Sequence, residues 1–257
     1  MIHPTSVVHK DARIDPSVEI GPFCVVGPHV RVGRGSKLLS HVVLEGWTEV
    51  GEDNMIFPFA VLGAVPQDLK YKGEETKLII GNRNKIRESV TLNLGTVGGG
   101  GVTRVGDDNL LMGYTHLGHD CIVGNHCVIA NYGGLAGHVT LGDYVTLGGQ
   151  VGISQFVRIG AHAFVTGQTG AEKDVPPFAI AMGQRPPSLK GCNIVGLRRR
   201  GYTADVIQKI NESMKLWMRH DVQKEQCLLE IESQYGEFKE IQEFVGFIRK
   251  SEIGVTR

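Results

Sequence analysis

Residues 115–121 read THLGHDC and place two histidines three residues apart, with an aspartate directly after the second. Histidine has a pKa near neutrality, so His119 could take a proton from a hydroxyl or an amine, while Asp120 fixes its tautomer. Histidine and aspartate are also zinc ligands. Whether His116, His119 and Asp120 form a general base or a metal site depends on the secondary structure that positions them.

An aliphatic residue recurs every six positions along most of the chain and is often followed by glycine. The pattern breaks near residues 68–79 and again near 95–104, where it restarts one residue out of register. This hexad predicts a mainly β fold, a parallel β-helix in which three hexads of about 18 residues form one triangular coil. The aliphatic positions are Ile2, Val8, Ile14, Ile20, Val26, Val32, Leu38, Leu44, Val50, Ile56, Leu62, Ile80, Ile86, Leu92, Val105, Leu111, Leu117, Val123, Ile129, Leu135, Leu141, Leu147, Ile153, Ile159 and Val165.

The hexad also predicts which side chains are buried. The aliphatic residue at position 1 points inward, and position 5 takes a smaller inward residue. Three cysteines occupy position 5 and are expected to be packing residues: Cys24, Cys121 and Cys127. Position 4 lies outward at a corner, so five histidines there are expected to be solvated: His29, His41, His126, His138 and His162. His119 is the only histidine at position 3.

The C-terminal part of the sequence has a different pattern. We expect the two prolines of DVPPF (174–178) to end the β ladder, because proline cannot donate to it. A loop with LRRRG follows, then a helix capped by Thr203, a second helix that stops at Gly236, and a third over 238–254. The sequence therefore predicts a β-helix over 1–190 and a small α-helical domain over 191–257.

Stacking of the coils predicts neighbours around THLGHDC. Residues 18 apart lie on adjacent coils, about 4.8 Å away. His119 is then next to Gly137, and Asp120 is next to His138. A glycine amide can approach a developing oxyanion closely, so a base, its orienting carboxylate and an oxyanion donor come together. Acyl transfer from a thioester needs these parts and no metal.

Zinc binding fits the same residues less well. Zinc requires three or four ligands converging at about 2.0–2.3 Å. His126 and His162 lie two coils apart, about 9.6 Å, which is too far to share an ion within one chain. A ligand from a neighbouring subunit remains an alternative, so we favour His119 as a general base and assign no metal.

Composition excludes several classes of protein. Among 257 residues, 27 are basic and 27 acidic, which argues against bulk nucleic-acid binding. No apolar run approaches the ~20 residues of a membrane span, and the N-terminus does not resemble a secretory signal. Five cysteines at irregular spacing argue against a disulfide framework, so a reduced, cytoplasmic protein is expected.

Several segments together resemble one family. They are QDLKY (67–71), NKIRESVTLNLGTV (84–97), HLGHDCIVGN (116–125), LAGHV (135–139), GGQVGISQF (148–156), DVPPF (174–178) and GLRRRGY (196–202). The chain resembles the UDP-N-acetylglucosamine 3-O-acyltransferases, hexapeptide-repeat enzymes that begin lipid A synthesis in Gram-negative bacteria. The resemblance implies a left-handed β-helix and a homotrimer with active sites between subunits. It also implies transfer of an (R)-3-hydroxyacyl chain from the phosphopantetheine of acyl carrier protein to the sugar 3-position, with no other cofactor.

The resemblance also implies roles for single residues. His119 matches the family's catalytic base, Asp120 its orienting carboxylate and Gly137 the oxyanion donor. Gly167 matches the residue that limits acyl-chain length. The residues matching substrate-binding positions are Gln67, Asp68, Lys70, His116, His138, Gln155, Asn193, Arg199 and Arg200. Basic residues that could meet the acidic acyl carrier protein are Arg158, Lys173 and Lys190, together with the arginine run.

Three positions depart from the family pattern and leave the acceptor open. They are Ser154, Arg185 and Val195. One alternative is the same reaction on a 3-amino sugar. Others are the N-acyltransferase of the same pathway, which carries an N-terminal domain not expected here, and an acetyl-CoA-dependent acetyltransferase. Two further alternatives belong to other classes of protein. They are a zinc-dependent trimer resembling γ-class carbonic anhydrases and a β-helix scaffold without catalytic activity.

Overall fold

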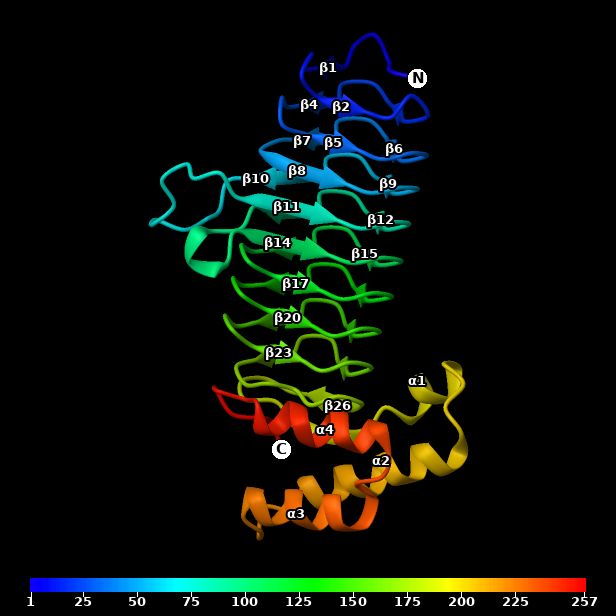
Figure 1. The fold of residues 1–257 in the computed structure, drawn as a ribbon, viewed down its shortest axis with the longest axis vertical. Coiled ribbons are helices and arrows are strands. Elements are labelled where there is room, and N and C mark those ends of the chain that lie inside the picture. Colours follow the sequence, from blue (N-terminus) through cyan, green and yellow to red (C-terminus); the bar gives the residue numbers. More distant parts are fainter.

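The computed structural model describes residues 1–257, and its main body is a β-helix with three sheets, seen from the side in Figure 1. Short strands follow one another around each coil, so each of three sheets takes every third strand. All strand pairs in the coils are parallel, and one antiparallel pair closes the C-terminal end. The parallel β-helix that the hexad predicts is confirmed, and it is left-handed, as the family resemblance implies.

The three sheets form the three walls of the prism. The first sheet contains β1 (Val7–Val8), β4 (Val25–Val26), β7 (Val43–Leu44), β10 (Val61–Ala64), β13 (Thr91–Asn93), β16 (His116–Leu117), β19 (Gly134–Leu135), β22 (Gly152–Ile153) and β25 (Gly170–Ala171). The second contains β2 (Arg13–Ile14), β5 (Arg31–Val32), β8 (Trp47–Val50), β11 (Lys77–Ile80), β14 (Val102–Val105), β17 (Ile122–Val123), β20 (Thr140–Leu141) and β23 (Arg158–Ile159). The third contains β3 (Glu19–Ile20), β6 (Lys37–Leu38), β9 (Met55–Ile56), β12 (Lys85–Ile86), β15 (Leu110–Leu111), β18 (Val128–Ile129), β21 (Thr146–Leu147), β24 (Phe164–Val165), β26 (Ala179–Met182) and β27 (Ser188–Cys192).

The coils stack in the register that the hexad predicts. Leu117 pairs with Leu135 on the next coil, and both side chains are fully buried in the single core. Burying such a side chain stabilises the fold by roughly 1.5–3 kcal/mol. Cys121 fills a small inward slot as expected, and burial raises the pKa of its thiol to about 12. The thiol therefore stays protonated at neutral pH and is a packing group.

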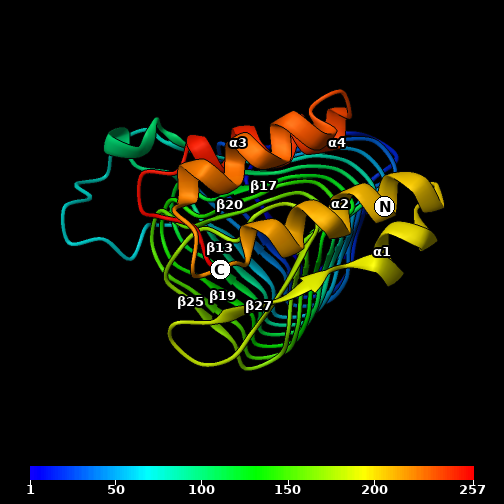
Figure 2. The ribbon, with the colours of Figure 1, turned by 90° about the horizontal axis from the view of Figure 1, so that it is seen from below.

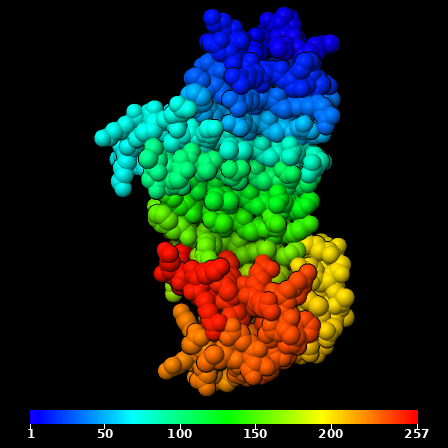
Figure 3. Space-filling model, viewed as in Figure 1, coloured from blue at the N-terminus to red at the C-terminus, as the bar shows by residue number.

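Both breaks in the hexad fall on the same edge of the prism, between the first and second sheets. One loop joins β10 to β11 and projects from the body, shown in cyan in the space-filling view (Figure 3). The other joins β13 to β14 and contains a 3₁₀ turn, η1 (Val97–Gly99). The GTVGGGG segment at this break forms a hydrogen-bonded turn that is capped by the Thr96 hydroxyl.

The expectation that DVPPF ends the ladder is wrong. β26 adds one more strand, parallel to β24, after the two prolines. Pro176 and Pro177 lie in the corner before β26, where the missing N–H groups break no strand pairing. β27 then pairs antiparallel with β26. β27 spans the expected domain boundary at residue 190, so that division stays a prediction.

Four helices lie across the C-terminal end of the β-helix (Figure 2). The helix capped by Thr203 and the helix that stops at Gly236 are confirmed. The third expected helix is present but ends at Arg249, before the predicted end at residue 254. A short helix within the segment expected to be a loop was missed. None of the helices has the length and apolar character that crossing a membrane demands. The helices are α1 (Ile194–Arg199), α2 (Ala204–Trp217), α3 (Lys224–Tyr235) and α4 (Lys239–Arg249).

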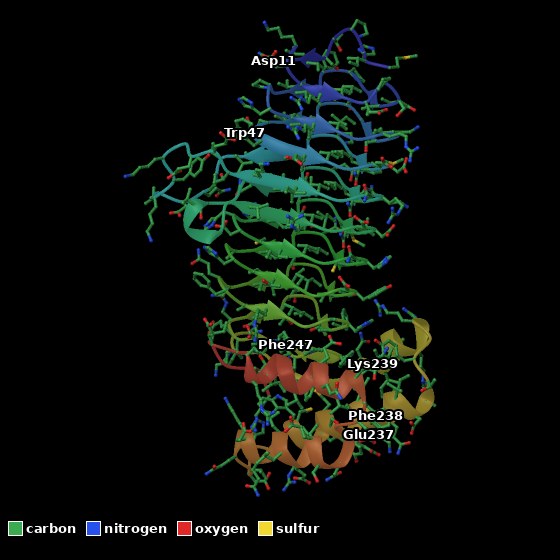
Figure 4. The ribbon with its side chains drawn as sticks, viewed as in Figure 1. Asp11, Trp47, Glu237, Phe238, Lys239 and Phe247 are labelled. Carbon is green, nitrogen blue, oxygen red and sulfur yellow. The ribbon has the colours of Figure 1, made fainter.

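A buried carboxylate connects the C-terminal helices to the last coils of the β-helix. Asp174 is fully buried and accepts two hydrogen bonds on one oxygen from the Arg158 guanidinium, at 2.8 and 2.6 Å. The same guanidinium stacks over Phe247 of α4, which is labelled in Figure 4. The Asp174 carbonyl also accepts from Thr256 N–H, and the Thr256 carbonyl accepts from the Trp217 indole. This network joins α2, α4 and the C-terminal segment to the β-helix.

His162 contradicts the expectation that position-4 histidines are solvated. Only 8% of it is exposed, because Phe178 and Tyr202 cover its ring, and the Tyr202 hydroxyl lies 3.1 Å from Nε2. Burial, together with a smaller contribution from nearby Arg200, lowers the pKa of His162 from 6.5 to about 4, although Asp143 opposes the shift.

His162 therefore makes stability depend on pH. Above pH 6.5 the His162 ring is neutral in both the folded and the unfolded chain. Between about pH 6.5 and 4 the ring binds a proton only in the unfolded chain. The free energy of unfolding should consequently fall by roughly 3 kcal/mol across this window. Urea unfolding at several pH values would measure it, with His162→Phe as the matched variant, which keeps a ring in the stack. Equal pH slopes for the two proteins would contradict this assignment.

Candidate active site

The residues predicted to do chemistry gather on the edge between the first and second sheets. His119 and Asp120 lie in the corner after β16, and Gly137 and His138 lie in the corner after β19 on the next coil. The His138 N–H donates to the His119 carbonyl at 2.9 Å, which fixes the two corners together. The stacking of His119 on Gly137 and of Asp120 on His138 is confirmed.

His119 and Asp120 form a hydrogen-bonded pair. Nδ1 of His119 lies 2.8 Å from Oδ2 of Asp120, and only 8% and 5% of the two residues are exposed. An ionised carboxylate can only accept a hydrogen bond, so the proton of the neutral imidazole belongs on Nδ1. Nε2 then keeps a free lone pair. This tautomer is the one that a general base requires.

Gly137 provides both the space and a donor beside the base. A Cβ at Gly137 would lie 2.5 Å from Cε1 and 2.7 Å from Nε2 of the His119 ring, so only glycine fits. Its carbonyl accepts from Phe156 N–H, but its own N–H donates no hydrogen bond within the chain. A free amide next to Nε2 can donate to an oxyanion that forms there.

Two threonines hold Asp120, and the sequence reasoning missed them. The Thr96 N–H donates to Oδ1 at 2.8 Å, and the Thr96 hydroxyl donates to Oδ2 at 2.6 Å. The Thr103 hydroxyl accepts from the Asp120 N–H at 2.8 Å. The only signal in the sequence was that the break in the hexad comes shortly before His119.

The arrangement fits proton transfer better than metal binding. His119, Asp120 and His138 offer ligand atoms within 4.8 Å of one another. The Asp120 carboxylate, however, already accepts from Thr96 N–H, the Thr96 hydroxyl and His119. His138 Nε2 lies 3.7 Å from Oδ2 of Asp120, and its ring meets the His119 ring edge-on. A metal would have to compete with the three hydrogen bonds that this carboxylate already accepts.

Five other predicted residues lie on or next to this edge. Gln155 is one coil beyond Gly137 and is exposed. His116 projects from β16, with Nδ1 2.7 Å from the Thr91 hydroxyl, and burial lowers the pKa of its ring. Gln67, Asp68 and Lys70 lie in the projecting loop between β10 and β11, two coils before His119.

Four predicted residues lie elsewhere. Asn193 caps α1 and donates to the His162 carbonyl, and Arg200 stacks over Tyr144, both on the edge between the second and third sheets. Arg199 ends α1 nearby. Gly167 lies in the corner between the third and first sheets. The predicted site residues of one chain therefore lie on all three edges of the prism.

The three departures from the family pattern are also separated. Ser154 directly precedes Gln155 on the edge that carries His119. Arg185 lies 3.6 Å from Glu172, and Val195 is 59% exposed on α1. Ser154 is on the edge of the base, and the Arg185 side chain reaches the same edge through Glu172, which lies one coil beyond Ser154.

Comparison with known proteins defines first a class and then a family. A model of the bacterial transferase hexapeptide, with six repeats, matches residues 103–137, which contain His119, Asp120 and Gly137. Fold and site thus define a hexapeptide-repeat transferase. A second model, domain 2 of UDP-N-acetylglucosamine O-acyltransferase, matches residues 174–256.

Solved structures match the whole chain. LpxA from Acinetobacter baumannii is 44% identical, with a TM-score of 0.96, covering 100% of this chain and 99% of that one. The Francisella novicida UDP-N-acetylglucosamine acyltransferase is 39% identical, with a TM-score of 0.97 and coverages of 100% and 94%. The Arabidopsis enzyme is 32% identical, with a TM-score of 0.86 and coverages of 100% and 100%. The chain belongs to the UDP-N-acetylglucosamine acyltransferase family.

Proposed function

We propose that this protein is an acyltransferase of lipid A synthesis that acts on UDP-N-acetylglucosamine. It moves an (R)-3-hydroxyacyl chain from acyl carrier protein to the 3-hydroxyl of the sugar. The observation that carries the proposal is the His119–Asp120 pair beside the free Gly137 amide, in a chain that matches UDP-N-acetylglucosamine acyltransferases over its full length.

The reaction uses the pair as a base and the amide as an oxyanion donor. Nε2 of His119 takes the proton of the sugar 3-hydroxyl as the oxygen attacks the thioester carbonyl. The Gly137 N–H stabilises the oxyanion of the tetrahedral intermediate. The intermediate collapses, the C–S bond breaks, and the imidazolium returns its proton to the departing thiolate. Asp120 holds the ring and stabilises its charge, as in other carboxylate–histidine pairs.

Substrate binding extends along and beyond this edge. We assign Gln67, Asp68, Lys70, His116, His138 and Gln155 to the sugar and acyl end, and Asn193, Arg199 and Arg200 to the nucleotide. Guanidinium groups pair with pyrophosphate oxygens in a bidentate manner, which suits the two arginines. Gly167 lacks a side chain and would leave room for a long acyl chain.

The division of these residues over three edges supports a homotrimer with its active sites between subunits. Residues on different edges of one rigid prism cannot face one substrate, but edges of neighbouring copies can. Sedimentation equilibrium should then give a mass of three times 28.0 kDa. A monomer that is fully active would overturn this assembly.

Acyl carrier protein is the proposed donor, carrying the acyl chain on its phosphopantetheine. Lys173 and Lys190 are exposed and remain available to an acidic partner. Arg158 is not, because its guanidinium is bound to the buried Asp174 and packed on Phe247.

An acyl-transfer assay tests the proposal. Purified protein would receive UDP-N-acetylglucosamine and its 3-amino analogue side by side, with 3-hydroxyacyl carrier proteins of several chain lengths. Product from UDP-N-acetylglucosamine supports the assignment and defines the acyl length. Product from the 3-amino sugar alone would replace the acceptor. No product from folded protein with any donor would refute the function.

A further inference from the structure

The loop between β13 and β14 donates hydrogen bonds to both carboxylate oxygens of Asp120. Thr96 donates its N–H to Oδ1 and its hydroxyl to Oδ2. The same hydroxyl accepts the Gly99 N–H at 3.2 Å, which directs its single proton to Asp120. Thr96 is 9% exposed, so water competes little for these bonds.

The loop is closed by its own backbone and packed on Asp120. Gly101 N–H donates to the Thr96 carbonyl at 2.8 Å, and Gly95 N–H donates to the Lys77 carbonyl of β11 at 3.1 Å. A Cβ at Gly99 would collide with the Asp120 carboxylate, whereas a Cβ at Gly98 would meet nothing within 4 Å. The loop therefore touches Asp120 through one glycine and one threonine.

We propose that Thr96 is a positioning residue of the acyl transfer, acting through Asp120 on the base His119; this rests on the proposed function. A carboxylate held by one hydrogen bond can rotate about Cβ–Cγ. With both oxygens bound by Thr96, its plane is fixed and Oδ2 faces Nδ1 of His119 at 2.8 Å. The loop thus sets the orientation of an imidazole that it does not touch.

Thr96→Val tests the hydroxyl with little change of shape. A hydrogen bond to a charged group of this strength corresponds to a fall in kcat of roughly tenfold to a hundredfold. We expect that fall with KM unchanged, and recovery to within about threefold of wild type in Thr96→Ser, which keeps the hydroxyl. Thr48→Val is the matched control, because Thr48 is fully buried and its hydroxyl donates to the Glu45 carbonyl rather than to Asp120.

A pair of glycine variants tests the loop contact independently. Gly99→Ala should lower kcat because its methyl group displaces the Asp120 carboxylate, and Gly98→Ala should leave kcat unchanged. Equal kcat values for the two folded variants would overturn the role of the loop. This pair remains informative if Thr96→Val fails to fold.

A double-mutant cycle separates positioning from general destabilisation. In the Asp120→Asn background, Thr96→Val should cause little further loss, because the two residues act through one contact. Full additivity, or wild-type kcat in Thr96→Val, would refute the inference while leaving wild-type acyl transfer intact. An inactive wild-type enzyme would instead refute the proposed function.

Discussion

His119→Ala should lower kcat for acyl transfer by a factor of roughly 10² to 10⁴ or more, because a general base usually contributes 10²- to 10⁴-fold to the rate. The alanine removes Nε2, the atom that takes the proton of the sugar hydroxyl beside Gly137. The fold should persist, because His119 lies at a corner outside the aliphatic core. Steady-state kinetics with acyl carrier protein substrates would measure the loss.

The matched control for His119 is His126→Ala. His126 lies in a corner of the same coil stack, but its side chain is 44% exposed and faces Asp108. That variant should retain wild-type kcat. Near-normal turnover of a folded His119→Ala protein would remove His119 from the role of base.

Gly137→Ala should also cause a large loss, roughly 10²- to 10³-fold in kcat, the range found when an oxyanion donor is removed. The new Cβ would lie 2.5 Å from Cε1 of His119, so either the ring or the amide must move. Both movements separate the base from the oxyanion donor. Single-turnover kinetics with saturating acyl donor would isolate the chemical step.

Gly246→Ala is the control for Gly137→Ala. A Cβ at Gly246 of α4 meets nothing within 4 Å, and alanine favours a helix more than glycine does. It should keep full activity and gain a little stability. Wild-type single-turnover rates in Gly137→Ala would show that this amide is not the oxyanion donor.

The regular part of the site was predictable because the repeat fixes distances through the backbone. Once each coil takes 18 residues, residue 119 must stack on 137 and residue 120 on 138. The burial of Leu117 and Cys121 follows from the same count. The pattern therefore placed the base, the carboxylate and the glycine amide without any tertiary information.

The contacts of Thr96 were not predictable in this way. Thr96 and Asp120 are 24 residues apart because the loop adds residues to one coil, and no fixed period gives the conformation of such an insertion. α1 was missed for a related reason. It has six residues and contains Gly196, so it depends on the Asn193 cap and on packing rather than on a periodic apolar face.

The burial of His162 shows another limit of the repeat. Its position in the hexad predicts an outward side chain, and the side chain does point outward. Tyr202 of the C-terminal segment then covers it, which no count along the β-helix reveals. For the same reason, the place of Arg200 on the edge between the second and third sheets became visible only with the three-dimensional structure.

The most direct test of the account is acyl transfer by enzyme that has been treated with a chelator and shown by elemental analysis to be free of metal. If the hydrogen-bonded His119–Asp120 pair and the Gly137 amide catalyse the reaction, we expect full turnover of UDP-N-acetylglucosamine by the metal-free enzyme. Adding zinc back should not change the rate. Turnover that disappears with the chelator and returns only with zinc would contradict it, and would make His119, Asp120 and His138 metal ligands instead.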